Sequence, residues 1–557
     1  MFCNRKKLFI YGLILTFIGN CFLSCRSIPG PDKNQVFKEI DYTEADIVSE
    51  EIKRIENFKE KDLLKALWRA WLLNDNVKDN SLVQECYNEC INQAVEQYNQ
   101  AVEEKDYVQA RRIYTSLKNT SYSGTADLSV TEKQLNESIV KNISALTTNS
   151  KKDSTIAQCM KGTVTILVDR GIRIEKGVGY SDMVLGSGFF ISKDGYLVTN
   201  HHVIESCVDP SYEGYARLYI KLSEDGETRI PAKVIGWDSI LDLALLKVEI
   251  DAPFYFELGS SDDLNVGDKV YAIGSPLGLE STLTSGIISS TDRDLNMSAK
   301  VFQLDAAVNS GNSGGPLIDQ KGRVQAIVFA GVQNYQGLNF AIPVEYLKND
   351  LPFLYAGGKK IHSWIGAYGK TKRLPGSGSK NEGIIVNYVQ PGSPAFLAGI
   401  RENDTILKLN DKTIYSLDQL HTDYIQLAAG TIVKITYVNS LGEEKEVPVY
   451  LEERPDTPGN SVFTHDIITS SLYPIIGVKL ANVSVENKNL YLITDVLKNS
   501  VADQSGFVVG DTVQILNAEV SKDKSAIYIE LYAKKRMHGN IDMGIGMQAP
   551  LDSPNYF

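Results

Sequence analysis

The spacing of hydrophobic residues changes character along the 557-residue chain. Between residues 41 and 120 there is no glycine or proline, and apolar residues recur at helical spacing, as in DLLKALWRAWLLN. Between about residues 155 and 345, short apolar runs such as GTVTILV, GYLVTN and KVYAIG alternate with glycine and aspartate turns, which is typical of an antiparallel barrel or sandwich. Two more β-rich segments follow. The pattern predicts a multidomain, mainly β protein with an α-helical region near its N-terminus.

The helical region, residues 41–148, contains alanine and tyrosine residues at a repeated spacing. In CINQAVEQYNQAVEEKDYVQARRIYTSLKN the repeating positions are Ala94, Tyr98, Ala101, Tyr107, Ala110 and Tyr114. This spacing is typical of one tetratricopeptide-type helix pair. One pair cannot build a solenoid, so a plain helical bundle agrees with the sequence equally well. Docking, spacing from a membrane and oligomer contact are all open as roles for this region.

The last two β-rich segments repeat one another. IIVNYVQPGSPAFLAGIRENDTILKLND aligns with LYLITDVLKNSVADQSGFVVGDTVQILNA, and each contains a strand, a Ser-x-Ala-x-x-x-Gly turn and a second strand. A duplicated domain is therefore predicted over residues 360–454 and 468–550, after a β-rich domain over residues 149–355. The stretch YAGGKK, between these domains, predicts a hinge.

The first residues have the pattern of an export signal. NRKK is followed by the apolar run LFIYGLILTFIGNCFLS, which is short for a membrane span, so residues 1–24 are predicted to be a signal peptide. The end of this run, FLSC, resembles the lipobox of bacterial lipoproteins, which implies lipidation of Cys25 and a tether over residues 25–40. Phe22 stands where leucine is usual, which leaves an uncleaved anchor or ordinary secretion as alternatives. The expected location is the bacterial cell envelope or periplasm.

The net charge bears on the class of partner, and the cysteines bear on metal binding and disulfides. A net charge of −12 and a pI of about 5.2 argue against a nucleic-acid partner. Four cysteines would follow the signal: Cys86, Cys90, Cys159 and Cys207. Cys86 and Cys90 are better read as packed thiols than as a metal pair, because no histidine lies nearby. A disulfide between Cys159 and Cys207 is left open.

The segment DAAVNSGNSGGPL carries the strongest candidate for chemistry. Glycines at positions 311, 314 and 315 surround Ser313, so a tight turn can expose its hydroxyl. The same turn would direct the backbone N–H groups of Gly311, Asn312 and Ser313 toward one oxygen, as an oxyanion hole does. Taken alone, GNSGG could equally be an ordinary turn.

A nucleophilic serine needs a base, and the base needs an acceptor that fixes its tautomer. LVTNHHV supplies the adjacent histidines His201 and His202, and SILDLALLKV supplies Asp242, with Asp238 as a rival acid. Because neighbours in an extended segment point in opposite directions, only one histidine can face the serine. The chain order His, Asp, Ser is that of chymotrypsin-type double barrels.

These segments, together with GSGFFISKDG, LGSSDDLNVGDKVYAIGSPLGL, STLTSGIIS and GLNFAIP, resemble the consecutive blocks of HtrA (Deg-type) serine proteases. The resemblance spans nearly all of residues 160–345 and implies a chymotrypsin-like double β-barrel. It implies His202 as the general base, Asp242 as its acceptor and Ser313 as the nucleophile, because the family base is the fourth residue of a T-x-x-H block. His201 is then a surface or supporting residue.

The resemblance implies further parts of the molecule. Arg293, in TSGIISSTDRD, would sense the state of the adjoining domain, and AGVQNYQGLNFAIP would form part of a pocket for small or medium apolar side chains. The duplicated domains resemble PDZ domains, which add an extended peptide to a sheet edge and capture its C-terminal carboxylate. The peptide-binding loops would be formed by Ile365, Gly366, Ala367, Ile476, Gly477 and Val478. The insertion GKTKRLPGSGSKNEG leaves the first groove undefined. A homotrimer or a larger oligomer is also implied.

Together, the sequence predicts an exported, membrane-tethered serine endopeptidase that degrades unfolded or damaged envelope proteins by acyl-enzyme chemistry. Unfolded polypeptides and peptide C-termini are the expected partners, and neither a metal nor another cofactor is expected. Two alternatives agree with the same residues. One is a non-proteolytic chaperone or peptide-binding scaffold, and the other is a regulated protease for one specific envelope substrate.

Overall fold

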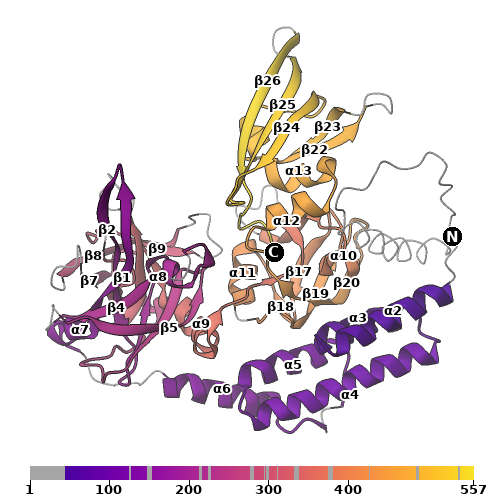
Figure 1. Ribbon diagram of the computed structural model, residues 1–557. Coiled ribbons are helices and arrows are strands. Elements are labelled where there is room, and N and C mark those ends of the chain that lie inside the picture. Colours follow the sequence, from indigo (N-terminus) through magenta and orange to yellow (C-terminus); the bar gives the residue numbers. More distant parts are fainter. Residues whose placement is uncertain are drawn as a thin grey trace. The chain divides into compact units, whose positions relative to one another are not determined.

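The computed structural model describes residues 44–557, apart from residues 125–126, 147–153, 213–215, 224–227, 276–281, 294, 296–299, 310, 332–337, 374–380, 426, 484–488 and 537–539 (Figure 1). The predicted signal peptide, the tether and Cys25 lie outside the described residues. Contacts divide the chain into two units. One contains residues 130–361 and 421–426, and the other contains the remaining residues, with the described helices before residue 130 and most of residues 362–557.

The first unit begins with helix α6 (Glu132–Leu146), and a barrel follows whose strands alternate between buried and accessible positions. Its elements are α7 (Ile156–Gly162), β1 (Thr163–Glu175), β2 (Val178–Phe190), β3 (Tyr196–Thr199), α8 (His201–Val208), β4 (Arg217–Leu222), β5 (Ile230–Asp238) and β6 (Leu243–Val248). The sheet runs β13-β5-β4-β1-β2-β3-β6, and pairing of β5 with β6 closes it. Val164, Ile166 and Val168, two residues apart on β1, all point into the core of this barrel.

A second barrel follows in the same unit. Its strands are β7 (Lys269–Gly274), β8 (Thr282–Arg293), β9 (Val301–Leu304), β10 (Pro316–Ile318), β11 (Val324–Gly331) and β12 (Asn339–Pro343), and they form a closed barrel in the order β10-β11-β12-β9-β8-β7. One apolar cluster joins the two barrels, because Phe189 and Leu245 of the first pack with Ile273 and Ile327 of the second. Helix α9 (Val344–Ala356) adds Leu351 and other residues to it. This double barrel confirms the predicted fold.

The stretch predicted to be a hinge is fixed to the first barrel. Residues Gly358–Lys359 form β13, which pairs in parallel with β5. The next residue, Lys360, is buried between two carboxylates: its Nζ lies 3.7 Å from Asp238 Oδ2 and also pairs with Asp350. The hinge prediction was therefore wrong for these residues, because a buried lysine held by two acids does not swing freely.

The other unit starts with antiparallel helices that pack in chain order. They are α2 (Glu44–Lys59), α3 (Leu63–Asn76), α4 (Ser81–Glu103) and α5 (Tyr107–Asn119). Four of the six repeating Ala and Tyr residues are buried between the helices: Ala94, Tyr98, Ala101 and Ala110. Cys86 and Cys90 are buried on α4 as free thiols. No described helix is long and apolar enough to cross a membrane.

The first PDZ domain is a sheet in the order β15-β16-β17-β19-β20. Its elements are β14 (Ser363–Trp364), β15 (Ala367–Arg373), β16 (Asn381–Val389), α10 (Pro394–Leu397), β17 (Thr405–Leu409), β18 (Lys412–Thr413), α11 (Leu417–Ile425), β19 (Ile432–Val438), β20 (Glu444–Tyr450) and β21 (Glu452–Glu453). Helix α11 begins beside β15, because the N–H of Leu417 donates to Thr371 Oγ1 at 3.0 Å.

The helices dock on the β19–β20 side of this PDZ domain (Figure 1). Trp68 of α3 is fully buried, and its indole N–H donates to the carbonyl of Pro448 at 2.9 Å. The hydroxyl of Tyr450 donates to Asp62, whose other oxygen caps α3. On α5, the hydroxyl of Ser116 accepts the N–H of Ile432 at 2.9 Å. The helices therefore pack against this domain, and their role stays open.

The second PDZ domain repeats the first with one clear difference. It contains α12 (Pro458–His465), α13 (Ile468–Ile476), β22 (Val478–Asn482), β23 (Leu490–Val496), α14 (Val501–Gln504), β24 (Thr512–Val520), β25 (Ala526–Arg536) and β26 (Asn540–Pro550), with the strands in that order in one sheet. In both domains a serine, Ser393 or Ser500, caps a short helix. The β24–β25 connection, residues 521–525, is a turn without a counterpart of α11.

Candidate active site

His202 and Asp242 form a closely coupled pair at the start of α8. The ring Nδ1 of His202 lies 2.7 Å from Asp242 Oδ2, and the backbone N–H of His202 donates to Asp242 Oδ1 at 2.8 Å. The first N–H groups of a helix have no acceptor within the helix, so the carboxylate satisfies one of them while it orients the ring. With Nδ1 facing the carboxylate, Nε2 is left as the basic nitrogen.

The backbone around Asp242 is bent to present its side chain. Asp242 has a φ of 55°, a conformation uncommon for a residue other than glycine. The amide of Asn200 donates to the Asp242 carbonyl at 2.8 Å. Upstream, Asp238 Oδ1 accepts the N–H groups of Ile240 and Leu241, at 2.8 and 2.9 Å. Asp238, the rival acid, therefore shapes the turn that carries Asp242.

The two histidines have opposite pKa shifts. Burial alone would lower the pKa of the His202 imidazole, but the hydrogen bond and the negative charge of Asp242 outweigh it and raise the pKa above its ordinary value. Burial dominates at His201 and lowers its pKa, although Asp242 opposes the change. Both residues lie in the first turn of α8 and not in an extended segment, so that premise of the sequence argument was wrong. Only His202 contacts the carboxylate directly.

The loop that carries Ser313 is held by buried hydrogen bonds. The N–H of Ser187 donates to the Ser313 carbonyl at 2.7 Å, and the hydroxyl of Ser187 donates to the Gly311 carbonyl at 2.6 Å. Gly311 and Gly314 have φ values of 104° and 85°, which side chains rarely adopt. The predicted glycine-dependent turn is present.

Two glycines show how closely the serine loop approaches the histidine helix. A Cβ atom on Gly314 would lie 2.3 Å from Thr199 Oγ1 and 3.0 Å from the backbone nitrogen of Asn200, two residues before His202. A Cβ atom on Gly186 would lie 2.6 Å from a Val203 methyl carbon and 3.3 Å from the carbonyl oxygen of Ser313. Residues on both sides of His202 therefore pack against the Ser313 loop or its immediate neighbours.

The Ser313 hydroxyl does not point at the imidazole in this structure. Among the described residues, it donates to the carbonyl of Phe329 at 3.2 Å and not to His202. Rotation about χ1, between staggered positions, is the motion by which a serine hydroxyl changes its partner. The structure thus places the three predicted residues in one region and joins two of them directly.

The candidate oxyanion donors differ from one another. The N–H of Asn312 donates to the Asn309 carbonyl at 3.0 Å, so it is engaged inside the loop. Within the described residues, the N–H groups of Gly311 and Ser313 have no protein acceptor, which leaves them for an oxygen from outside. Asn312 supports the turn through its own carbonyl, which accepts the N–H of Gly315 at 2.9 Å.

Arg293 and the cysteines lie apart from this pair. The Arg293 side chain is exposed at the end of β8, and its Nε donates to Gln303 Oε1 at 2.6 Å. Cys159 is buried in the cluster between the barrels, whereas Cys207 packs at the edge of the first barrel core. Both are free thiols, so the disulfide left open by the sequence is not formed. No group of metal-binding side chains occurs in the described part of the chain.

The two predicted peptide-binding loops have different settings. Gly366 has a φ of 80° between buried Ile365 and Ala367, and the loop leads directly into β15. Gly477, in contrast, is the left-handed C-cap of α13. Ile476 and Val478 on its two sides are fully buried.

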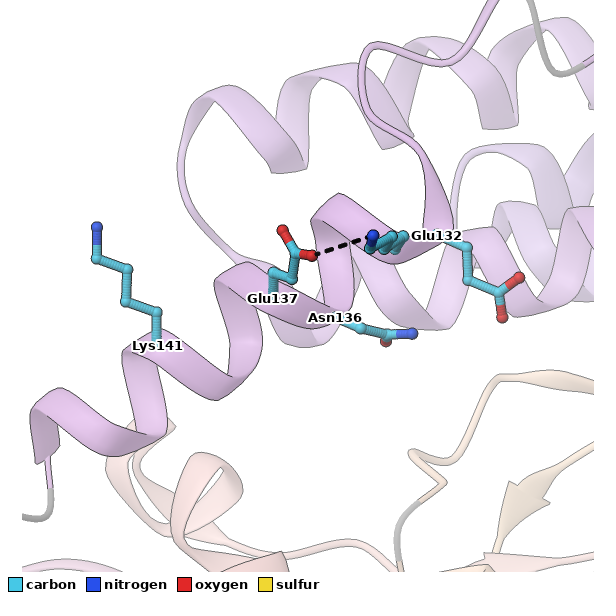
Figure 2. A pocket seen from close by; sticks show the side chains of 5 residues that line it. Glu132, Asn136, Glu137 and Lys141 are labelled. Atoms are coloured by element: carbon cyan, nitrogen blue, oxygen red, sulfur yellow. Dashed lines mark ion pairs between the residues drawn. The ribbon is translucent and has the colours of Figure 1, made fainter.

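A surface hollow of about 710 Å³ lies on α6 (Glu132–Leu146), before the first barrel (Figure 2). Its lining is Glu132, Lys133, Asn136, Glu137 and Lys141. One helix supplies all of these side chains, and Lys133 pairs with Glu137 at 4.0 Å. No residue of the His202–Asp242 pair or the Ser313 loop belongs to it.

Sequence reasoning overlooked the residues that hold this arrangement together. Ser187, Gly186 and Asn200 bring the serine loop to the histidine helix, as the contacts above show. The sequence did contain a signal for these residues. LGSGFF and TNHH contain small or amide residues, which can lie close to a neighbouring backbone.

Four domain families match the chain. They are a trypsin-like peptidase domain over residues 186–327, a PDZ domain over residues 366–449, a TP0546 family PDZ domain over residues 459–551 and a domain of unknown function (DUF8517) over residues 46–139. The double barrel is thus of the trypsin-like peptidase class, followed by two PDZ domains.

Proteins that match about 60% of this chain are described as proteases. A probable periplasmic serine endoprotease, DegP-like, from Marinomonas sp. (strain MWYL1) is 34% identical over 346 residues, which are 60% of this chain and 71% of the relative. A protein with the same description from Chlamydia trachomatis is 32% identical over 61% of this chain and 68% of its own length. The chain belongs to the DegP-like, HtrA-type family of serine endoproteases.

Solved structures align with about half of this chain. The HtrA-type protease AlgW with decapeptide aligns with 25% identity and a TM-score of 0.45 over 54% of this chain and 98% of its own. A serine endoprotease from Yersinia pestis aligns with 29% identity and a TM-score of 0.42 over 54% and 99%.

Proposed function

We propose that this protein is a serine endopeptidase whose catalytic triad is His202, Asp242 and Ser313. The observation that carries the proposal is the doubly hydrogen-bonded pair of His202 and Asp242, packed beside a glycine-flanked serine. Family membership supports the same reading.

In the proposed mechanism, the Ser313 hydroxyl turns from Phe329 to His202 when a peptide binds. Its oxygen attacks the peptide carbonyl carbon while His202 Nε2 takes the proton, and Asp242 stabilises the imidazolium. The N–H groups of Gly311 and Ser313 stabilise the negative oxygen of the tetrahedral intermediate. His202 then protonates the leaving amine, and water releases the acyl group from Ser313 by the same steps.

The proposed substrates are unfolded or damaged proteins of the bacterial cell envelope. The relatives described as periplasmic support this location, as does the signal pattern over residues 1–24. We propose that a lipid on Cys25 tethers the enzyme to a membrane. The apolar P1 preference expected from AGVQNYQGLNFAIP belongs to the same proposal.

The two PDZ domains and Arg293 are proposed to regulate the protease. The first PDZ domain would bind peptides along β15, next to Ile365, Gly366 and Ala367, and the second would do so beside Ile476, Gly477 and Val478. Arg293 would relay PDZ occupancy to the protease. A homotrimer or larger oligomer is proposed from the family.

The test is hydrolysis of unfolded casein by the purified protein, with Ser313→Ala as the matched control. Casein fragments that appear with the parent chain and not with the control would support the proposal. Casein left intact by both, when both bind it and prevent its aggregation, would favour a chaperone instead. Incorporation of labelled palmitate, lost in Cys25→Ala, would test the lipid tether.

A further inference from the structure

The outer strand of the first PDZ sheet is already paired with another part of the chain. Residues Asn555–Phe557 run antiparallel to β15, with Tyr556 opposite Tyr368. The N–H of Ala367 donates to the Phe557 carbonyl at 2.9 Å, and the N–H of Phe557 donates to the Ala367 carbonyl at 3.0 Å. A third bond joins the N–H of Gly369 to the Asn555 carbonyl at 3.0 Å. We call residues Asp552–Phe557 the docking segment.

The side chains of the docking segment are buried as well as its backbone. Phe557 is fully buried, and a Cβ atom on Gly369 would lie 3.1 Å from its ring, so the missing side chain makes room for it. Tyr556 is 2% exposed, packs edge-on against Tyr368 with ring centroids 5.0 Å apart, and donates to the Pro474 carbonyl at 3.3 Å. Two aromatic side chains thus anchor the segment.

An ion pair fixes the base of the docking segment. Arg454, which follows β21, reaches Asp552 with two nitrogens, at 2.5 and 3.4 Å from the two carboxylate oxygens. The Arg454 side chain is only 6% exposed, whereas Asp552 is 45% exposed, so the guanidinium is held in place while solvent reaches the carboxylate. The TP0546 family PDZ match ends at residue 551, so the docking segment lies beyond the matched domain.

PDZ domains bind a partner by adding its strand to the sheet edge that follows the glycine loop. The docking segment occupies that edge, directly after Gly366, and its Phe557 lies beside the loop. We propose that the docking segment is an intramolecular ligand of the first PDZ groove, and that an external peptide with aromatic residues at the positions of Tyr556 and Phe557 binds there only by displacing it. The inference rests on the proposed peptide-binding function of this domain.

Displacement has a quantitative consequence. If the groove is free in only a fraction of molecules, the apparent dissociation constant of an added peptide is the intrinsic constant divided by that fraction. Loosening the docking segment should therefore strengthen binding of an external peptide. An ordinary surface substitution should leave it unchanged.

The experiment measures binding of a fluorescent peptide, LDSPNYF, by anisotropy. The protein is the full chain carrying Ser313→Ala, which prevents cleavage of the probe. Adding Phe557→Ala should tighten binding at least about tenfold, and Asp552→Asn should tighten it by less. The control Leu516→Ala, at a residue 54% exposed on β24, should not change it. Equal affinity for the parent and Phe557→Ala would overturn the proposal.

A locked variant keeps the test decisive if Phe557→Ala fails to fold. Tyr368 and Tyr556 face each other in the antiparallel pair, where Cα atoms are about 4.5 Å apart when the pair is not hydrogen-bonded, within reach of a disulfide. With Tyr368→Cys and Tyr556→Cys combined, oxidation should abolish peptide binding and dithiothreitol should restore it. Tyr368→Cys alone is the control. Undiminished binding by the oxidised double variant would refute the idea.

These outcomes are separable from the proposed protease function. The binding assays use a chain without the Ser313 hydroxyl, so they do not depend on catalysis. Casein hydrolysis could fail while displacement of the docking segment is observed, and the reverse is equally measurable.

Discussion

His202 and Asp242 are joined twice, once through the imidazole and once through the backbone N–H of the histidine. The two carboxylate oxygens have separate partners, so the side chain cannot turn without losing one of them. This relationship distinguishes Asp242 from Asp238, which accepts two backbone N–H groups of its own turn and pairs with Lys360.

Exchanging each acid for its amide should separate catalysis from stability. Asp242→Asn keeps the size of the side chain but favours the wrong imidazole tautomer, so we expect kcat/KM for a peptide substrate to fall by about 10³–10⁴-fold. The fall should occur without a comparable loss of thermal stability. Asp238→Asn is the matched comparison, because it should lower the Tm while the folded fraction keeps most of its activity. The reverse result would make Asp238 the catalytic acid.

The two neighbouring histidines should titrate on opposite sides of pH 6.5. Asp242 raises the pKa of His202, and burial lowers that of His201. Histidine-labelled NMR of the Ser313→Ala protein can follow both rings, with His201→Ala and His202→Ala to assign them. Because the base must be neutral, activity should rise with pH through the pKa of His202. Loss of activity in His201→Ala alone would contradict this assignment.

Lys360 should contribute strongly to the stability of the double barrel. Lys360→Met leaves Asp238 and Asp350 buried without their cation, which is expected to cost about 3–5 kcal/mol in the free energy of unfolding. Urea denaturation measures this change. Lys233→Met, at an exposed position on β5, serves as the control and should cost little.

The same cluster should make stability depend on pH. Burial, with the charge of Asp238 adding to it and Lys360 opposing it, raises the pKa of Asp350 to about 7, above its ordinary value. The folded state therefore holds a proton that the unfolded chain has lost between about pH 4 and 7, so this carboxyl contributes less stability as pH rises through that range. Asp350→Asn should flatten this part of the profile. An unchanged slope would show that Asp350 does not carry the proton.

Trp68 should be the main anchor of the helices on the first PDZ domain. Trp68→Ala removes a fully buried indole and its bond to Pro448, at an expected cost of about 3–5 kcal/mol. Differential scanning calorimetry should show a lower Tm for the transition of this unit. Leu82→Ala, at a residue 63% exposed on α4, should leave the Tm within experimental error.

Local motifs predicted the parts of the site that depend on local chemistry. The glycines around Ser313 could be read from the sequence alone, whereas the choice of Asp242 over Asp238 needed the resemblance to HtrA proteases. The start of α8 at His201 could not, because LVTNHHV looks like a continuing strand until Asp242 supplies an acceptor for the helix N-terminus. The anchored Lys360 was missed for a similar reason, since its two acids are distant in sequence.

Contacts between domains were beyond the sequence pattern. The Ala and Tyr rhythm predicted how the helices pack on each other, yet nothing in it indicates that Trp68 binds Pro448 nearly 400 residues later. The resemblance to PDZ domains gave Gly366 and Gly477 the same expected role, as part of a peptide-binding loop. It could not reveal that helix α13 ends at Gly477, whereas the short strand β14, which pairs with β21, precedes Gly366.

Pro448 has one consequence beyond its bond to Trp68. It lies on β20, the outer strand opposite β15, and proline offers no N–H to a further strand. Its carbonyl is taken by the indole, while Asn555–Phe557 cover the other border of the sheet. A fragment limited to the first PDZ domain would uncover both borders, and the β15 border, which has no proline, would be open to pairing with other copies. Neighbouring segments of this chain thus protect the domain's solubility.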